Sequence, residues 1–222
     1  MKELDTIVYV TSVIYFKEKP LSYSTIRSAF SPQERLQQTI KTIESVRQHI
    51  PNAYIVLIES GIQWEWLMSI RTLVDAFIYI GDKKIIIRFV DSSYKWAWEL
   101  ISILYILWLK RKVLKEYIIK ISWRYWINEQ FDITMFFEED KFSFHKSTSP
   151  NGISWYSTRL YNLHRSNKIY WIIIMFLGLF ISFFNISIEN IFYYLLPSYR
   201  VSKKKVLWVS WYSWVDKVII TE

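Results

Sequence analysis

Polar side chains follow several apolar segments of the chain, and their types could bind or activate a ligand. Thr11 lies near the end of the first such segment, Glu59 at the end of the second, and Ser122 and Arg124 at and after a later one. If these segments are parallel strands of an open α/β sheet, ligands bind beyond their carboxyl ends. These hydroxyl, carboxylate and guanidinium groups therefore predict a polar ligand site at one edge of a sheet.

Most familiar catalytic patterns are absent from the sequence. The chain has no Cys, which removes disulfides, thiolate zinc sites and cysteine nucleophiles. Its three His residues, His49, His145 and His164, are too scattered to suggest a metal cluster. It also lacks a Gly-rich phosphate loop and the GxSxG and HExxH patterns. Hydrolytic triads and zinc chemistry thus have little support.

The elements that must position these residues alternate between strands and helices. Apolar, β-branched runs predict buried strands at 7–14, 53–59, 77–80 and 117–122. The segments between them predict helices at 31–51, 64–75 and 96–110, the first starting with a capping box of Ser31 and Glu34. Residues 84–90 fit either a strand or an irregular apolar segment. The order predicts an α/β domain with a mostly parallel sheet.

Composition and charge narrow the class of protein. With 222 residues, 52% of them hydrophobic, the chain can bury the core of one domain, which excludes global disorder. It carries 28 Lys and Arg against 20 Asp and Glu, and most of the excess lies between Arg159 and Leu207. Such a basic segment suits an anionic membrane surface, a phosphorylated ligand or nucleic acid, or is simply a solvated face. No nucleic-acid-binding motif is recognised, so no nucleic-acid partner is expected.

The run at 169–188 is apolar and carries no charge. Its length permits a membrane span, but Ser182 and Asn185 interrupt it, which favours a helix in the core or facing a membrane. A helix lying on an anionic surface is intermediate between the two. Because residues 1–14 do not form a signal peptide, we expect a cytoplasmic protein, peripheral to the inner face of the membrane. The alternative function is a non-catalytic, membrane-associated protein.

Three stretches resemble a group of small glycosyltransferase-like proteins of bacteria and large DNA viruses. They are residues 11–61, the sequence KISWRYWINEQFD at 120–132 and WYSTRLY at 155–161. The resemblance implies a single Rossmann-like domain of the GT-A type over residues 1–222, with a hydrophobic C-terminal helical region. Residues 1–135 would bind a nucleotide sugar, and residues 136–222, with the apolar helix 169–188, would form the acceptor side.

The resemblance implies transfer of a sugar from a nucleotide sugar to a glycan or lipid-linked acceptor. The residues expected to bind the donor are Thr11, Arg27, Glu59, Lys95, Ser122 and Arg124. An inverting reaction needs a carboxylate as general base. The candidates for this catalytic role are Asp91, Glu99 and Asp132. The residues expected to line the acceptor side are Ser157, Thr158 and Arg159.

Proteins of this type hold a divalent metal, Mn²⁺ or Mg²⁺, on the diphosphate through an acidic DxD motif after a strand. Here Trp123-Arg124-Tyr125 follows the expected strand 117–122, so metal dependence is open and no metal ligand is assigned. A cation must still oppose the charge of the leaving diphosphate. Arg124, Lys95 and Arg27 are the candidates, and an Arg side chain can bind two oxygens of a diphosphate.

Tryptophan stands where the family pattern has glycine. The chain has only four Gly but twelve Trp. The Trp residues at expected Gly positions include Trp96, Trp98, Trp123, Trp208 and Trp211. The hypothesis is a translation artefact, because UGA encodes glycine in some bacterial lineages and tryptophan in other codon tables; aromatic platforms for a sugar or base are the alternative. We expect the coding DNA to show TGA at these codons, and TGG there would contradict the hypothesis.

Overall fold

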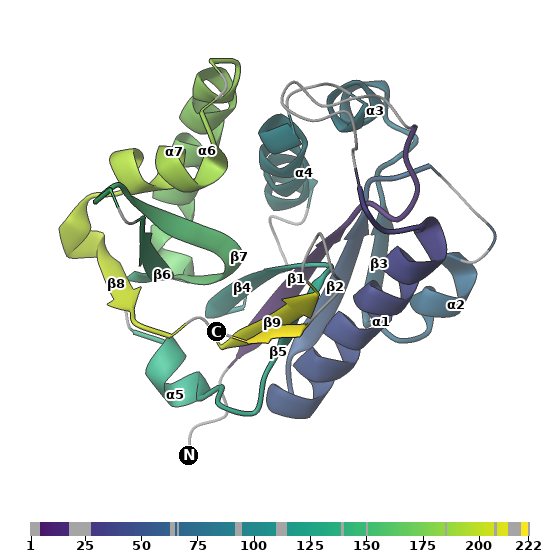
Figure 1. Cartoon of the computed structure of the whole chain (residues 1–222), viewed down its shortest axis with the longest axis horizontal. Coiled ribbons are helices and arrows are strands. Elements are labelled where there is room, and N and C mark those ends of the chain that lie inside the picture. The colour runs from purple at the N-terminus through teal and green to yellow at the C-terminus, as the bar shows by residue number, and fades with distance from the viewer. Residues whose placement is uncertain are drawn as a thin grey trace.

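A mixed β-sheet of seven strands forms the centre of the protein (Figure 1). The structure is a computed structural model that describes residues 5–17, 28–62, 65, 67–91, 95–109, 115–138, 140–149, 151–184, 186–206, 208–212 and 219–221, without the side chains of 95, 96, 108, 109 and 135. The strands of this sheet and of a second, smaller sheet are, in chain order, β1 (Thr6–Ser12), β2 (Tyr54–Glu59), β3 (Ala76–Tyr79), β4 (Tyr117–Ser122), β5 (Tyr125–Ile127), β6 (Phe142–Thr148), β7 (Ser154–His164), β8 (Val201–Lys204), β9 (Val209–Tyr212) and β10 (Ile219–Thr221).

The helices lie mainly between the strands in the chain order. They are α1 (Pro32–His49), α2 (Leu67–Arg71), α3 (Lys84–Val90), α4 (Lys95–Leu109), α5 (Ile133–Phe136), α6 (Lys168–Ser182) and α7 (Ile188–Leu195). The expected capping box begins α1: the Ser31 hydroxyl accepts from the Glu34 amide at 3.2 Å, and the Glu34 carboxylate accepts from the Ser31 amide at 2.8 Å. This pair satisfies two amides that the first turn of a helix leaves without partners.

The large sheet has the strand order β3-β2-β1-β4-β7-β6-β8, and a small sheet has the order β10-β9-β5. Strands β3, β2, β1 and β4 are parallel, β7 is antiparallel to β4 and β6, and β6 is parallel to β8. Four of the six neighbouring pairs in the large sheet are thus parallel. The predicted α/β domain with a mostly parallel sheet is confirmed.

Strand β1 is buried along its whole length, and its side chains alternate between two cores. Val8 and Val10 pack in a core with Ile43 of α1. Ile7 packs in the other core with Leu100 of α4. Because both faces of the strand are covered, its sequence is a continuous apolar run rather than an alternation of apolar and polar residues.

The prediction for residues 84–90 is wrong, because this segment is the helix α3. Ile86 and Val90 are buried one helical turn apart, whereas Ile85 and Arg88 are exposed. The β-branched composition favoured a strand, but packing of one face against α4 decides for a helix. The intrinsic propensity of a short segment predicts its secondary structure poorly when tertiary contacts bury one of its faces.

The prediction of a single apolar helix at 169–188 is also wrong. Helix α6 ends at Ser182, and α7 begins at Ile188. The Ser187 hydroxyl accepts from the Asn190 amide at 3.3 Å and caps the start of α7. A hydroxyl that caps a helix fixes a boundary that hydrophobicity alone does not show. Among the residues that the structure describes, no helix has the length and apolar character needed to cross a membrane.

Candidate active site

The parallel pairing of β1 with β2 and β4 gathers polar side chains at the carboxyl edge of the sheet. Ser12 is in register with Glu59, and Thr11 is in register with Ser122. The sequence-predicted residues Thr11, Glu59 and Ser122 therefore end neighbouring strands at one edge. This is the edge at which open α/β sheets bind ligands.

Glu59 hydrogen-bonds to the loops that follow β1 and β2 at this edge. Its Oε1 accepts from the Ile14 amide at 3.0 Å and from the Gly61 amide at 2.7 Å. A Cβ at Gly61 would lie 2.4 Å from the Tyr15 carbonyl oxygen, so only glycine fits this close approach. Burial raises the pKa of the Glu59 carboxyl above its usual range, although the two amides act to lower it. The buried Glu59 carboxylate thus connects the loop after β1 with the loop after β2.

Arg35 of α1 brings a buried positive charge to the same edge. Its guanidinium carbon lies 4.2 Å from the ring centroid of Phe16 and 4.6 Å from that of Trp123. The Trp123 amide donates to the Thr11 carbonyl at 3.0 Å, and its own carbonyl accepts from the Thr42 hydroxyl at 2.6 Å. The backbone of Trp123 is therefore fixed between β1 and α1, with its indole against the guanidinium of Arg35.

A second buried charge, Lys120, lies inside β4. Its side chain is 3% exposed and forms an ion pair with Glu99 of α4. The Lys120 ammonium also donates to the Ser122 hydroxyl at 2.6 Å and to the Thr158 carbonyl at 2.8 Å. A charge buried this deeply is stable only when it is paired and hydrogen-bonded, and all of these partners are present.

Glu189, in the first turn of α7, extends this group of charges. The Thr158 hydroxyl donates to Glu189 Oε1 at 3.1 Å. Burial raises the pKa of the Glu189 carboxyl, and the charge of Glu99 raises it further. Lys120, Glu99, Ser122, Thr158 and Glu189 together are called the Lys120 cluster below. The cluster joins α4, β4, β7 and α7, and so connects the carboxyl edge of β4 with the C-terminal part of the chain.

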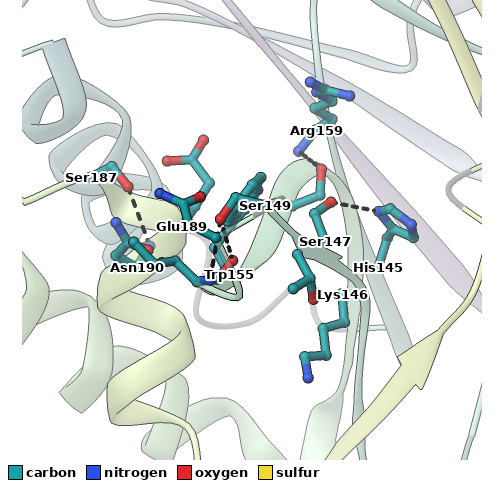
Figure 2. Close-up of a pocket in the computed structure, with 13 residues that line it drawn as sticks. His145, Lys146, Ser147, Ser149, Trp155, Arg159, Ser187, Glu189 and Asn190 are labelled. Carbon is teal, nitrogen blue, oxygen red and sulfur yellow. Dashed lines mark hydrogen bonds between the residues drawn. The ribbon is translucent and has the colours of Figure 1, made fainter.

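Beside Glu189 is an open cavity of about 840 Å³ between the β6–β7 hairpin and α7. Ser157 and Arg159 of β7 line it, with His145 of β6 and Asn190 of α7. Figure 2 shows Glu189 and Asn190 entering from α7, and Arg159 and His145 lying on the hairpin side. Of the three predicted acceptor-side residues, Ser157 and Arg159 thus face this cavity, whereas Thr158 hydrogen-bonds within the Lys120 cluster.

The three predicted acid–base carboxylates lie in different parts of the structure. Glu99 pairs with Lys120. Asp91 follows the end of α3, and the Asp132 carboxylate accepts from the Thr134 amide at 2.8 Å at the start of α5. Figure 1 shows α3 and α5 at opposite ends of the molecule. Glu99 is therefore the one of the three that the structure brings to the Lys120 cluster.

The predicted donor-binding cations are only partly described. Arg124 lies in the turn between β4 and β5, where its Nε donates to the Tyr125 hydroxyl at 3.0 Å. Lys95 is the first residue of α4, but its side chain lies outside the described part, and Arg27 lies outside the described residues altogether. Of these three cations, the described part of the chain places only the side chain of Arg124, close to the carboxyl edge.

Arg35, Lys120 and Glu189 are not among the site residues predicted from the sequence. A lysine within the apolar strand sequence YIIKIS is a signal for Lys120, because an unpaired charge has no place in a buried strand. The sequence Ser187-Ile188-Glu189 also shows a helix start with an acidic first turn. Arg35 gives no such signal, since a basic residue on an amphipathic helix is ordinarily solvated.

The described residues at the carboxyl edge do not fit a divalent metal ion. Glu59 is fully buried and its Oε1 already accepts from two backbone amides, and Glu99 is paired with Lys120. Hard cations such as Mg²⁺ prefer sets of free oxygen ligands. Within the described residues, no group of three or more His, Asp or Glu is placed to hold a metal ion.

One tryptophan at an expected glycine position has a backbone that favours glycine. Trp208 has a φ angle of 58°, in the left-handed region that L side chains rarely adopt. Its ring packs edge-on against Phe131 and Phe136, with ring centroids 6.1 Å and 5.8 Å away. The indole is thus accommodated by aromatic packing, while the backbone has a conformation suited to glycine.

The sequence matches no protein-family model, and no curated protein matches it either. Among solved structures, the glycosyltransferase GlyE of Streptococcus pneumoniae TIGR4 has a TM-score of 0.51 at 13% identity, over 92% of this chain and 46% of that one. The bifunctional glycosyltransferase WbbM has a TM-score of 0.50 at 10% identity, over 92% and 39%. A glycosyltransferase involved in glycosylation of the PBCV-1 major capsid has a TM-score of 0.48 at 12% identity, over 91% and 82%.

The chain therefore has a glycosyltransferase-like α/β fold. It spans less than half the length of GlyE and of WbbM. At these identities the likeness shows the fold alone.

The variant Glu59→Gln should gain stability relative to the unaltered protein as the pH rises. The amide oxygen of Gln can accept from the same two backbone amides, but Gln does not titrate. Because the folded state binds the Glu59 proton more tightly than the unfolded state, the unaltered protein loses stability as the pH rises through the raised pKa. Thermal unfolding of both proteins between about pH 4 and pH 8 measures this difference.

The control is Glu44→Gln, at an exposed position of α1, for which we expect a change within about 0.5 kcal/mol at every pH. A stability difference between Glu59→Gln and the unaltered protein that is constant over this range would contradict the prediction.

Proposed function

We propose that this protein transfers a sugar from a nucleotide sugar to a hydroxyl group of a glycan or lipid-linked acceptor. The observation that carries the proposal is the Lys120 cluster, which connects the carboxyl edge of a glycosyltransferase-like sheet with the cavity beside Glu189. In this reaction the bond between the anomeric carbon and the diphosphate oxygen breaks, and a bond to the acceptor oxygen forms. The acceptor proton goes to a base, and the diphosphate leaves with the bonding electrons.

On the donor side, the proposed diphosphate-binding cations with described side chains are Arg35 and Arg124 at the carboxyl edge. A guanidinium binds two diphosphate oxygens in parallel and stabilises the charge that develops on the leaving group. The hydroxyls of Thr11 and Ser122, at the ends of β1 and β4, are proposed to bind the donor beside them. Arg27 and Lys95 remain proposed donor ligands from the sequence, and Glu59 is proposed to act by holding the two edge loops.

On the acceptor side, we assign the general base to Glu189. Its carboxylate lines the cavity that Ser157 and Arg159 also line, so an acceptor hydroxyl in this cavity can reach it. The raised pKa of Glu189 brings it closer to working pH, which makes a carboxylate a better base. Asp91, Glu99 and Asp132 were the candidates from sequence, but Glu99 is the paired anion of Lys120 and Asp132 caps a helix.

Replacement of Trp123 by Gly should create or strengthen donor binding. The indole lies against Arg35 at the carboxyl edge, and its removal uncovers the guanidinium. A donor at 100 times its Kd would stabilise the folded state by about 2.7 kcal/mol. The measurement is thermal unfolding of the unaltered chain and of Trp123→Gly with UDP-, GDP-, CMP- and dTDP-sugars, with and without Mn²⁺.

The matched control is Trp208→Gly, which removes an equal side chain from a residue that packs on Phe131 and Phe136 rather than on Arg35. We expect no donor-dependent gain from this variant over the unaltered chain. Trp123→Ala gives a second test of the same space if the glycine variant does not fold. If no donor stabilises either Trp123 variant, the proposed donor site is overturned.

Glu189→Gln should lower kcat about 10²–10⁴-fold, because a neutral amide cannot take the acceptor proton. The raised pKa adds a pH signature: in the unaltered enzyme the rate falls as the pH falls through this pKa, because the base becomes protonated. The matched control is Glu129→Gln, at an exposed position after β5. Initial rates against pH, with donor affinity measured separately, test the assignment. Full activity of Glu189→Gln with unchanged folding would contradict it.

A further inference from the structure

Helix α6 and the turn that follows it expose a stripe of large apolar side chains. The residues of this apolar stripe are Ile169, Ile173, Phe176, Leu177, Phe180, Phe183 and Phe184. Their exposed fractions run from 44% to 79%. The first five recur every three to four residues along one side of α6, and Phe183 and Phe184 follow in the turn after the helix. At 1.5 Å per residue, the helical part of the stripe, from Ile169 to Phe180, is about 17 Å long. A soluble surface rarely presents such a continuous apolar patch without a partner.

The opposite side of α6 packs in the core, so the apolar stripe faces away from the core. Trp171, Ile174 and Met175 are buried in the core that also contains Leu100 of α4. At Gly178 a Cβ would lie 3.0 Å from Ile191 of α7, so α6 and α7 approach closely there. The helix therefore cannot turn its exposed residues inward without losing this core.

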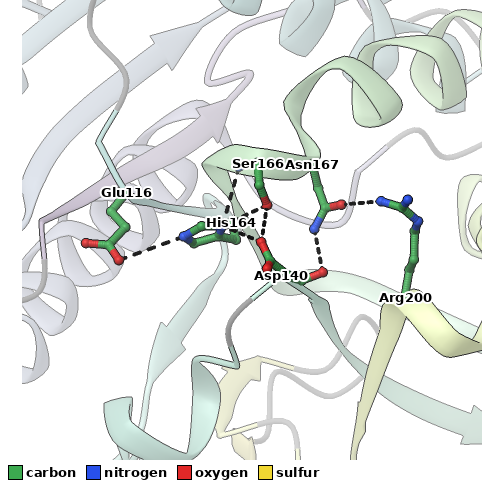
Figure 3. A network of polar contacts seen from close by, with 6 residues as sticks. All are labelled: Glu116, Asp140, His164, Ser166, Asn167 and Arg200. Atoms are coloured by element: carbon green, nitrogen blue, oxygen red, sulfur yellow. Dashed lines mark hydrogen bonds and ion pairs between the residues drawn. The ribbon is translucent and has the colours of Figure 1, made fainter.

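A network of polar contacts anchors the start of α6 (Figure 3). The Asn167 amide nitrogen donates to the Asp140 carbonyl at 2.8 Å, and Arg200 donates to the Asn167 side-chain oxygen at 2.8 Å. The Ser166 hydroxyl donates to the Asp140 carboxylate at 2.5 Å, and His164 Nδ1 lies 3.3 Å from the same carboxylate. The Asp140 carboxylate beside this end of the helix thus has polar contacts with Ser166 and His164.

Positive charge lies at both ends of the apolar stripe. Arg165 and Lys168 precede Ile169, and the sequence from 165 to 188 contains no Asp or Glu. At the other end, the Phe183 ring lies 6.0 Å from the Phe89 ring of α3. Helix α3 carries Lys84 and Arg88 at exposed positions, with Ile85 also exposed. Basic groups that flank an apolar helix face suit the interface of an anionic bilayer.

We propose that the apolar stripe docks the protein on the surface of an anionic phospholipid bilayer. Helix α6 lies in the plane of the interface, with the stripe inserted among the acyl chains near the headgroups. Arg165 and Lys168 at one end, and Lys84 and Arg88 at the other, contact the lipid phosphates. The charge favours a bilayer over a second copy of the chain, because each copy carries a net charge of +8 and the basic ends would repel each other.

The test is co-sedimentation of the full chain with vesicles of phosphatidylcholine alone and of phosphatidylcholine mixed with phosphatidylglycerol. We expect binding to the anionic vesicles that weakens with salt. The double variant Phe176→Ser with Phe180→Ser should weaken this binding about tenfold or more, because two large apolar side chains no longer insert. Arg88→Gln should weaken binding to anionic vesicles about fivefold.

The matched control is Met68→Ser on α2, which removes an apolar side chain that is 64% exposed outside the stripe. It should bind vesicles like the unaltered protein. Equal losses from Met68→Ser and from the stripe variant would overturn the proposal, as would failure of the unaltered protein to bind anionic vesicles. A dimer without lipid that the stripe variant converts to a monomer would assign the stripe to a second copy instead.

These measurements need no sugar donor or acceptor. Vesicle binding and glycosyl transfer can therefore succeed or fail independently of each other.

Discussion

The pairing of β1 with a parallel strand on each side is the constraint on which the structure depends. β1 is buried on both faces, so its register with β2 and β4 also fixes the position of every side chain at the carboxyl edge. A slip of one residue would exchange the two cores, placing Ile7 where Val8 now packs. The same register brings Thr11 level with Ser122. The candidate site is thus a consequence of how the core is packed.

The Lys120 cluster relies on that packing, because it places charges where water cannot reach them easily. A buried ion pair with one partner removed costs about 3–5 kcal/mol, so Lys120 and Glu99 depend on each other. The pairing of β4 with β7 brings Thr158 to Lys120, which donates to the Thr158 carbonyl. The Thr158 hydroxyl in turn donates to Glu189 of α7. One group of charges therefore holds together the edge expected to bind the donor and the cavity expected to bind the acceptor.

The tryptophans illustrate how a fold accommodates a large residue at positions where the sequence analysis expects glycine. At Trp208 the backbone adopts a φ of 58° and the indole packs among phenylalanines. At Trp123 the backbone is fixed by bonds to Thr11 and Thr42, and the indole lies on Arg35. Such packing stabilises the fold, but at the carboxyl edge the indole occupies space in the proposed donor site. Stability and the proposed donor binding therefore make opposite demands at position 123.

The sequence by itself determined the strands of the large sheet up to β4, the capped start of α1 and the α/β class, because these rest on local patterns of apolar residues and caps. It also placed Thr11, Glu59 and Ser122 at one edge, since parallel strands end together. Tertiary structure alone decided that 84–90 is a helix and that 169–188 breaks into two, because packing of one face overrides local propensity. It also decided the meeting of Lys120, Glu99 and Glu189, whose separation in sequence gives no sign that they pack together.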